Sequence, residues 1–245
     1  MEEIQKALEN AAKLAGEKGL IRFTRFLDPA EVMLAEHLAR QYGAKLSVWG
    51  GYDQAERAVA CFSPANEEID RAQFPVVCLH SRYSAKFCSL SHRDLLGSFM
   101  ALGLTRSCAG DMIISGADIY LFAHEQTADF IVQSMTSAGK APLEFQRLAQ
   151  TPEMPEPEGT HFSSVVSSLR LDGVLAAAYR LSRSEAAECI RGGMVKVNHL
   201  PCDRVDVQLK EGALLSMRGK GRVRLMSVDG MTRKQRIGIT LFRYE

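Results

Sequence analysis

The sequence predicts an α+β protein of several domains, and three features of the chain favour that fold class. Segments with the 3.6-residue spacing of helices are interspersed with short segments that alternate like strands. The stretch TPEMPEPEGT, residues 151–160, is rich in proline and glutamate and is typical of an extended linker. Acidic and basic residues are distributed unevenly on the two sides of that linker. The 245 residues, 46% of them apolar, are enough to bury cores on both sides.

The first predicted domain is an α/β segment that spans about residues 1–73. A helix is expected over residues 2–17, and Asp28-Pro29 predicts the start of a second, because Asp is a good N-cap and Pro fits the first helical position. Strands are expected over residues 44–50 and 57–63, which makes the order ααββ. No basic or hydroxyl pattern follows Gly50-Gly51, so a turn is favoured there over a phosphate-binding loop.

The second predicted domain covers residues 74–150 and alternates between strands and helices. The predicted strands are 74–81, 85–91, 111–115, 118–124 and a last one near 142–148, with helices over 92–104 and 125–139. This alternation predicts an RRM-like or ferredoxin-like α+β domain. The strands lack an evident pair of aromatic residues of the kind that stacks on bases, so base stacking by this sheet is not expected.

The third predicted domain covers residues 161–245 and begins with two short helices. The apolar positions of LRLDGVLAAAY follow one helix face, namely Leu171, Val174, Leu175 and Ala178. Ser182 and Glu185 fit a capping box at the start of the second helix, and Gly192-Gly193 is a common end signal. The segment MVKVNHLP then alternates like a strand, with Lys196 outward. Asp172 is interpreted as a helix-start or ion-pairing residue and not as a catalytic acid.

Charge distinguishes this third domain from the rest of the chain. Residues 161–245 carry 15 Lys and Arg against 8 Asp and Glu, whereas residues 1–160 carry 15 against 21. Such segregation favours a polyanion as the partner of the basic end. A helix start also favours anions, and the glycines within the stretch 218–222 let the backbone approach a phosphate closely. We expect the residues that contact this polyanion to form a single face: Arg170, Asp172, Arg180, Ser182, Arg183, Ser184, Arg191, Lys196, Asn198, Arg218, Lys220 and Arg222.

About 30 residues of this region resemble the S4 RNA-binding domain, whose RNA-binding motif is of the αL type. The family pattern is an RLD segment, a hydrophobic helix, SRSxA, a short helix that ends in Gly, and VxVN. The matching residues here are Arg170 to Asp172, Ser182 to Ser184, Ala186, Ile190, Gly193, Val195, Val197 and Asn198. The family usually has Asn-Gly in the next turn, and this chain has Asn198-His199. His199 must therefore adopt the turn at some cost in strain, or the turn must widen.

The whole chain resembles the bacterial YlmH type of S4 protein. The resemblance includes FLDPAE at 26–31, WGGYDQAER at 49–57, HRDLLGSFMALGLTR at 92–106, Gly110-Asp111 and the helix at 125–139. It implies a cytoplasmic, ribosome-associated, non-catalytic factor of translation or ribosome quality control. The implied partner is structured RNA, namely rRNA and possibly tRNA of the large ribosomal subunit.

Other functional classes lack supporting motifs. The six cysteines show no metal-binding spacing, and neither a nucleophile elbow nor a nucleotide loop is present, so no metal, cofactor or catalytic residue is predicted. No apolar run approaches the roughly 18 residues of a membrane span. Two alternatives stay open. One is an RNA-modifying enzyme that uses the S4 domain as a targeting arm, and the other is a scaffold that recruits a protein through residues 1–150.

Overall fold

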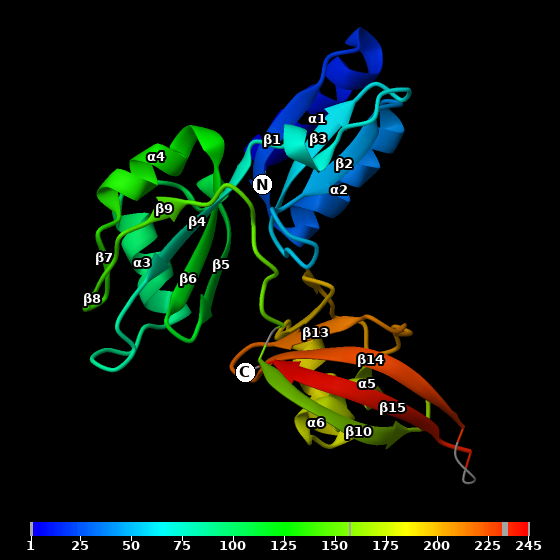
Figure 1. The fold of residues 1–245 in the computed structure, drawn as a ribbon. Coiled ribbons are helices and arrows are strands. Elements are labelled where there is room, and N and C mark those ends of the chain that lie inside the picture. Colours follow the sequence, from blue (N-terminus) through cyan, green and yellow to red (C-terminus); the bar gives the residue numbers. More distant parts are fainter. Residues whose placement is uncertain (1, 157, 232–234, 245) are drawn as a thin grey trace. The chain divides into compact units, whose positions relative to one another are not determined.

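The computed structural model describes residues 2–156, 158–231 and 235–244 and divides into two compact units, Met1–Pro155 and Glu156–Glu245 (Figure 1). Six α-helices and several antiparallel sheets within the described residues confirm the predicted α+β class. Pro157, in the predicted linker, lies outside the described residues. Regular structure resumes at Gly159, so the linker is shorter than predicted.

The first elements of unit 1 are α1 (Glu2–Lys18), β1 (Arg22–Leu27), α2 (Pro29–Gln41), β2 (Lys45–Trp49) and β3 (Ala58–Ser63). The strands form an antiparallel sheet in the order β1-β3-β2. The predicted start of α2 is confirmed, because Asp28 and Glu31 form a capping box. The predicted order ααββ is wrong, because β1 lies between the helices. A register shift between Phe23 and Phe26 disturbs the alternation of β1 and hid it from pattern analysis.

The middle elements of unit 1 are β4 (Val76–Arg82), α3 (His92–Ala101), β5 (Ala109–Ser115), β6 (Asp118–His124), α4 (Glu125–Ser134), the short hairpin β7 (Ser137–Ala138) and β8 (Ala141–Pro142), and β9 (Gln146–Arg147). Their main sheet has the strand order β5-β6-β4-β9. The main elements thus follow one another as βαββαβ, the order of ferredoxin-like folds. The RRM-like assignment and the domain boundary near residue 73 stay predictions.

Two predicted elements of this region are wrong. Residues 85–91 form no strand, since the backbone turns at Ser84, whose carbonyl accepts from the Cys88 amide at 3.2 Å, and Phe87 is 82% exposed. Helix α4 ends at Ser134 instead of continuing to Gly139. Gly139, with φ of 56°, instead lies in the turn between β7 and β8. The sequence analysis correctly placed a chain reversal at Gly139, but it predicted the end of a helix where the structure has a hairpin turn.

A partly buried carboxylate, Asp111 of β5, joins the early and the middle elements of unit 1. It accepts hydrogen bonds from the Tyr52 hydroxyl at 2.9 Å, the Glu56 amide at 2.7 Å and the Arg57 amide at 3.2 Å. Burial raises the pKa of Asp111 despite these bonds. The Tyr52 ring also stacks on Phe122, with centroids 5.0 Å apart. The segments WGGYDQAER and Gly110-Asp111 therefore meet in an interior contact that holds the two parts of the unit together.

Unit 2 contains β10 (Gly159–Val166), α5 (Leu171–Tyr179), α6 (Arg183–Arg191), β11 (Val195–Val197), β12 (Leu200–Pro201), β13 (Leu214–Met217), β14 (Gly221–Met231) and β15 (Ile237–Tyr244). The antiparallel sheet has the order β10-β15-β14-β13-β11-β12. Both helices pack against one face of this sheet in a shared core (Figure 1). The four predicted apolar positions of α5 are fully buried, and the capping box of Ser182 and Glu185 is confirmed.

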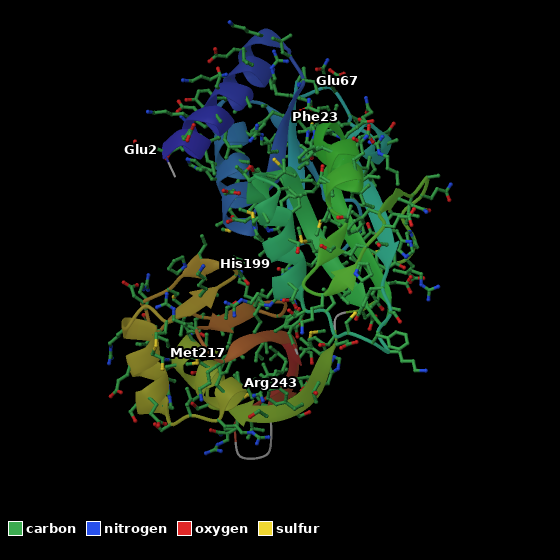
Figure 2. All side chains as sticks on the ribbon, turned by 90° about the vertical axis from the view of Figure 1, so that its left-hand side faces the viewer. Glu2, Phe23, Glu67, His199, Met217 and Arg243 are labelled. Atoms are coloured by element: carbon green, nitrogen blue, oxygen red, sulfur yellow. The ribbon has the colours of Figure 1, made fainter. Side chains whose placement is uncertain are left out.

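The turn between β11 and β12 shows how the chain accommodates Asn198-His199 where S4 domains usually have Asn-Gly. Asn198 and His199 both have positive φ, at 48° and 69°, which is the requirement of a tight two-residue hairpin turn. His199, labelled in Figure 2, therefore adopts the turn without widening it. The Asn198 side chain stabilises the hairpin, because its Oδ1 accepts from the Leu214 amide at 2.8 Å.

Candidate nucleic-acid interface

The starts of α5 and α6 are held together by one carboxylate, Asp172. Its Oδ1 lies 3.2 Å from Arg170 Nε and 2.9 Å from the Gly173 amide, and its Oδ2 lies 2.8 Å from Arg183 Nη2. The Asp172 side chain is 11% exposed, whereas those of Arg170 and Arg183 are 37% and 55% exposed. Asp172 therefore anchors two arginines from within and leaves both in contact with solvent.

The electrostatics keep this cluster charged at neutral pH. Burial opposes ionisation of Asp172, but the hydrogen bonds from Arg170 and Arg183 outweigh it and hold the pKa of Asp172 below its ordinary value. A guanidinium has five N–H donors in a fixed planar arrangement. One bond to Asp172 therefore leaves each arginine with the capacity to bind phosphate oxygens, in an orientation that the carboxylate fixes.

The N-terminus of α6 contributes less to anion binding than the sequence suggested. Ser182 Oγ accepts from the Glu185 amide at 3.2 Å, and Glu185 Oε2 accepts from the Ser182 amide at 2.7 Å. The backbone hydrogen bond from Ser182 lowers the pKa of Glu185, and Lys220 lowers it further. A carboxylate thus already lies at this helix start and satisfies part of its donors. Ser184 is exposed, with its Oγ 3.1 Å from that of Ser182.

The glycine-rich turn 218–222 joins β13 to β14 beside these helices. Gly219 and Gly221 have φ of 77° and 81°, which a side chain would disfavour. The Tyr179 hydroxyl donates to the Gly221 carbonyl at 2.9 Å, which ties the turn to the end of α5. Lys220 and Arg180, which precede Gly221 and follow Tyr179 in the sequence, are both exposed, and Lys220 interacts electrostatically with Glu185. These contacts bring the cationic turn close to the end of α5 and the start of α6.

The prediction of a single face is wrong for Lys196 and Arg222. Lys196 lies opposite Ser216, and Ser216 lies opposite Arg222, so their side chains share a face of the sheet. The neighbours Val195, Met217 and Val223 point into the core beneath the helices. Lys196 and Arg222 thus project from the face that α5 and α6 do not cover.

The remaining predicted residues are placed less centrally. Arg191 is exposed at the C-terminal end of α6, the opposite end of the helix from Arg183. Arg218 is exposed, and its amide donates to the Met194 carbonyl at 3.0 Å, which places it beside the entry into β11. Contacts of all twelve predicted residues with RNA stay predictions.

One arginine of this surface was missed by the sequence analysis. Arg204 lies in the segment that precedes β13, and its Nη2 is 3.5 Å from Asp206 Oδ2. A side-chain hydrogen bond from Arg204 lowers the pKa of Asp206, and Arg170 adds to that shift. The same segment bonds to the start of α5, where the Leu171 amide donates to the Val207 carbonyl at 2.8 Å. These contacts bring the segment that carries Arg204 to the start of α5, and no local sequence pattern predicts them.

The described residues contain no group of three or more His, Cys, Asp or Glu side chains that could hold a metal ion. None of the described helices combines the length and the apolar character that crossing a bilayer requires.

Comparisons with known proteins agree with this architecture. Family models match residues 1–64 (YlmH, N-terminal), 70–151 (putative RNA-binding domain in YlmH) and 169–215 (S4 domain). The chain is 34% identical over 241 residues to the Ribosome-associated protein quality control protein P2 of Bacillus subtilis (strain 168), covering 98% of this chain and 93% of the relative.

A solved structure, the cell division protein ylmH from Streptococcus pneumoniae, is similar in fold. The TM-score is 0.52 at 20% identity, over 60% of this chain and 90% of that one. The three family models and the Bacillus subtilis relative, which matches 98% of this chain, together show its family. The chain belongs to the YlmH family and carries a C-terminal S4 domain.

Proposed function

We propose that this protein binds structured RNA of the ribosome and acts, without catalysis, in translation or ribosome quality control. The proposed partner is the large subunit, through rRNA and possibly a bound tRNA, in the cytoplasm. The relative from Bacillus subtilis is named for ribosome-associated quality control, which supports this assignment. The S4 domain supplies the RNA-binding surface.

The observation that carries the proposal is the pair of arginines anchored on Asp172. Two guanidinium groups that one buried carboxylate holds in place can bind phosphate oxygens with less loss of side-chain freedom than unanchored lysines. The exposed cations Arg180 and Lys220 extend the surface. Few aromatic side chains accompany the helices, which favours recognition of RNA shape and backbone there.

We call the surface formed by Arg170, Arg180, Arg183 and Lys220 the helix surface. Charge reversal on it tests this proposal. The double variant Arg183→Glu with Lys220→Glu should lose co-sedimentation with ribosomal particles. For the parent, the logarithm of the affinity should fall linearly with the logarithm of the salt concentration, with a slope of at most roughly 0.9 in magnitude per phosphate contact. Lys210→Glu is the matched control, since Lys210 is an exposed cation of the same unit. Unchanged co-sedimentation of the folded double variant would contradict the proposal.

The middle part of unit 1 is proposed as a second RNA contact. Residues 70–151 match a family described as a putative RNA-binding domain. The turn after β4 presents Phe87, which is 82% exposed, with Lys86 Nζ 5.8 Å from its ring centroid. Replacement of both by Ala should weaken binding to ribosomal particles without altering unfolding. No observation on the described residues favours the alternative of an RNA-modifying enzyme.

A further inference from the structure

The face of the unit 2 sheet that α5 and α6 leave uncovered carries a row of aromatic and arginine side chains. We define the aromatic-arginine surface by five residues of β10, β14 and β15: His161, Arg222, Arg224, Phe242 and Tyr244. The strand register places them together, because Phe242 lies opposite both Arg224 and His161. Their neighbours Val223, Leu225 and Leu241 point into the core on the other side. Figure 1 shows these three strands edge to edge.

The side chains of this surface contact one another in sequence. The His161 and Phe242 rings have centroids 4.7 Å apart, and the Phe242 and Tyr244 rings 4.9 Å apart at an interplanar angle of 84°. Arg224 Nε donates to the Tyr244 hydroxyl at 2.7 Å, and the Arg222 guanidinium lies 4.9 Å from the Tyr244 ring centroid. Three aromatic rings thus lie in contact across β10 and β15, with two arginines of β14 beside Tyr244. All five side chains are partly or fully exposed.

We propose that this surface binds unpaired nucleotides of RNA by stacking, separately from the phosphate contacts of the helix surface. Every base has a face that stacks on an aromatic ring or a guanidinium plane, and arginine beside the ring neutralises the phosphate that follows. Lys196 lies on the same face beyond Ser216 and Arg222, which extends the positive charge toward the edge of the sheet.

Charge and location favour RNA as the occupant. Three cations, Lys196, Arg222 and Arg224, share this face. The carboxylate Asp229, beside it, accepts hydrogen bonds from Ser227 at 2.5 Å and from Thr240 at 2.9 Å. The S4 match covers residues 169–215 and so excludes β10, β14 and β15. The aromatic-arginine surface therefore lies on strands outside the residues matched by the S4 model. An unpaired RNA segment is the occupant that its exposed rings and arginines suit.

The test uses the full chain and a fluorescent oligouridine that has no secondary structure. Tyr244→Ala should weaken its binding, followed by anisotropy, by about tenfold, the scale of one lost stacked base. Tyr244→Phe should retain most of the binding, because the ring remains and only the hydroxyl that accepts from Arg224 is lost. Phe242→Leu, which keeps an apolar side chain against Gly159, provides a second measurement. Equal binding by wild type and Tyr244→Ala, or equal loss in Tyr244→Phe and Tyr244→Ala, would overturn the proposal.

A variant of each surface, tested on both ribosomal particles and oligouridine, distinguishes base stacking from the proposed ribosome binding. Arg183→Glu should weaken binding to ribosomal particles far more than binding to oligouridine, and Tyr244→Ala should do the reverse. Loss of both ligands in Arg183→Glu alone would assign all nucleotide binding to the helices and refute a stacking surface. Loss of oligouridine binding in Tyr244→Ala, with ribosome binding untouched by Arg183→Glu, would support the stacking surface while contradicting the proposed function.

Discussion

Each unit contains an aspartate that is wholly or partly buried, and the two have opposite surroundings. Asp111 in unit 1 accepts from Tyr52 and from two backbone amides. Its neighbour Arg106 is also partly buried, and desolvation lowers the pKa of Arg106 to about 10. Asp172 in unit 2 accepts mainly from two arginines that reach solvent. The first carboxylate holds two parts of a fold together. The second fixes two arginines that reach solvent, and we propose that it thereby orients them toward a partner.

The largest effect is expected from Asp111→Ala. This change leaves the Tyr52 hydroxyl and the amides of Glu56 and Arg57 without their acceptor, and it removes the charge that faces Arg106. The free energy of unfolding of unit 1 should fall by roughly 3 kcal/mol, measured by urea denaturation. Asp118→Ala is the control, since its ion pairs with His80 and Arg82 are partly exposed and should contribute less than about 1 kcal/mol. Similar losses of stability in both variants would contradict the role of Asp111 in holding the early and middle elements of unit 1 together.

The second largest loss of stability is expected at Gly51, which precedes Tyr52, the residue whose hydroxyl donates to Asp111. Gly51 has φ of 103°, and an added Cβ would meet the Phe122 ring. Gly51→Ala should therefore lower the melting temperature by an amount equivalent to roughly 2 kcal/mol, from strain plus the clash. Gly193→Ala at the end of α6 is the matched control, because Gly193 has φ of 67° and open space around it. The control should cost about 1 kcal/mol, and equality of the two variants would show that the tight packing contributes nothing.

If Asp172 orients its two arginines, removing its negative charge should weaken RNA binding even though the unit becomes more positive. Asp172→Asn makes the unit more positive, which would strengthen purely non-specific attraction to RNA. If the carboxylate instead fixes Arg170 and Arg183, affinity for ribosomal particles should fall by roughly fivefold, the scale of one weakened charge-assisted contact. Asp203→Asn provides a matched loss of charge at an exposed position of the same unit. Tighter binding by Asp172→Asn would reject the orienting role.

The smallest effect is a difference in pH dependence between the units. The pKa of Asp111 is raised in the folded state, so wild type should gain stability relative to Asp111→Asn as pH falls from neutral toward about 4. The pKa of Asp172 is lowered, so its contribution is complete above about pH 4 and is lost only as pH falls further. Denaturation from pH 7 to 3 should give these opposite trends, with slopes below about 1.4 kcal/mol per pH unit. Parallel trends would remove the distinction between the two carboxylates.

Local signals predicted the helix starts and ends of unit 2 well. Ser182, Glu185 and the glycines after α6 act within a few residues of one another, so they can be recognised without tertiary information. The strand β1 was missed because a register shift breaks its alternation, and the strand predicted at 85–91 failed because apolar residues in a turn imitate one. Both errors concern segments whose state depends on pairing with distant strands.

The candidate site was only partly accessible from sequence, for a similar reason. The Arg170, Asp172 and Arg183 cluster lies within a recognisable motif, whereas Arg204 joins it only through contacts of the segment before β13. Lys196 was assigned to the wrong face, because one residue of alternation decides the side of a strand and the position of the helices was not known. The aromatic-arginine surface depends on the register of β10, β14 and β15, which no local pattern specifies.

The strand order of unit 2 has a consequence for how the chain acquires its structure during synthesis. β15 lies between β10 and β14, so β10 has no hydrogen-bonding partner until β15 has been translated. The two helices and β11 to β13 can pack earlier, whereas the first strand of the unit must wait as an unpaired edge for the last. Nascent chains that stop before Ile237 would expose that edge, and limited proteolysis should cleave them within Gly159–Val166.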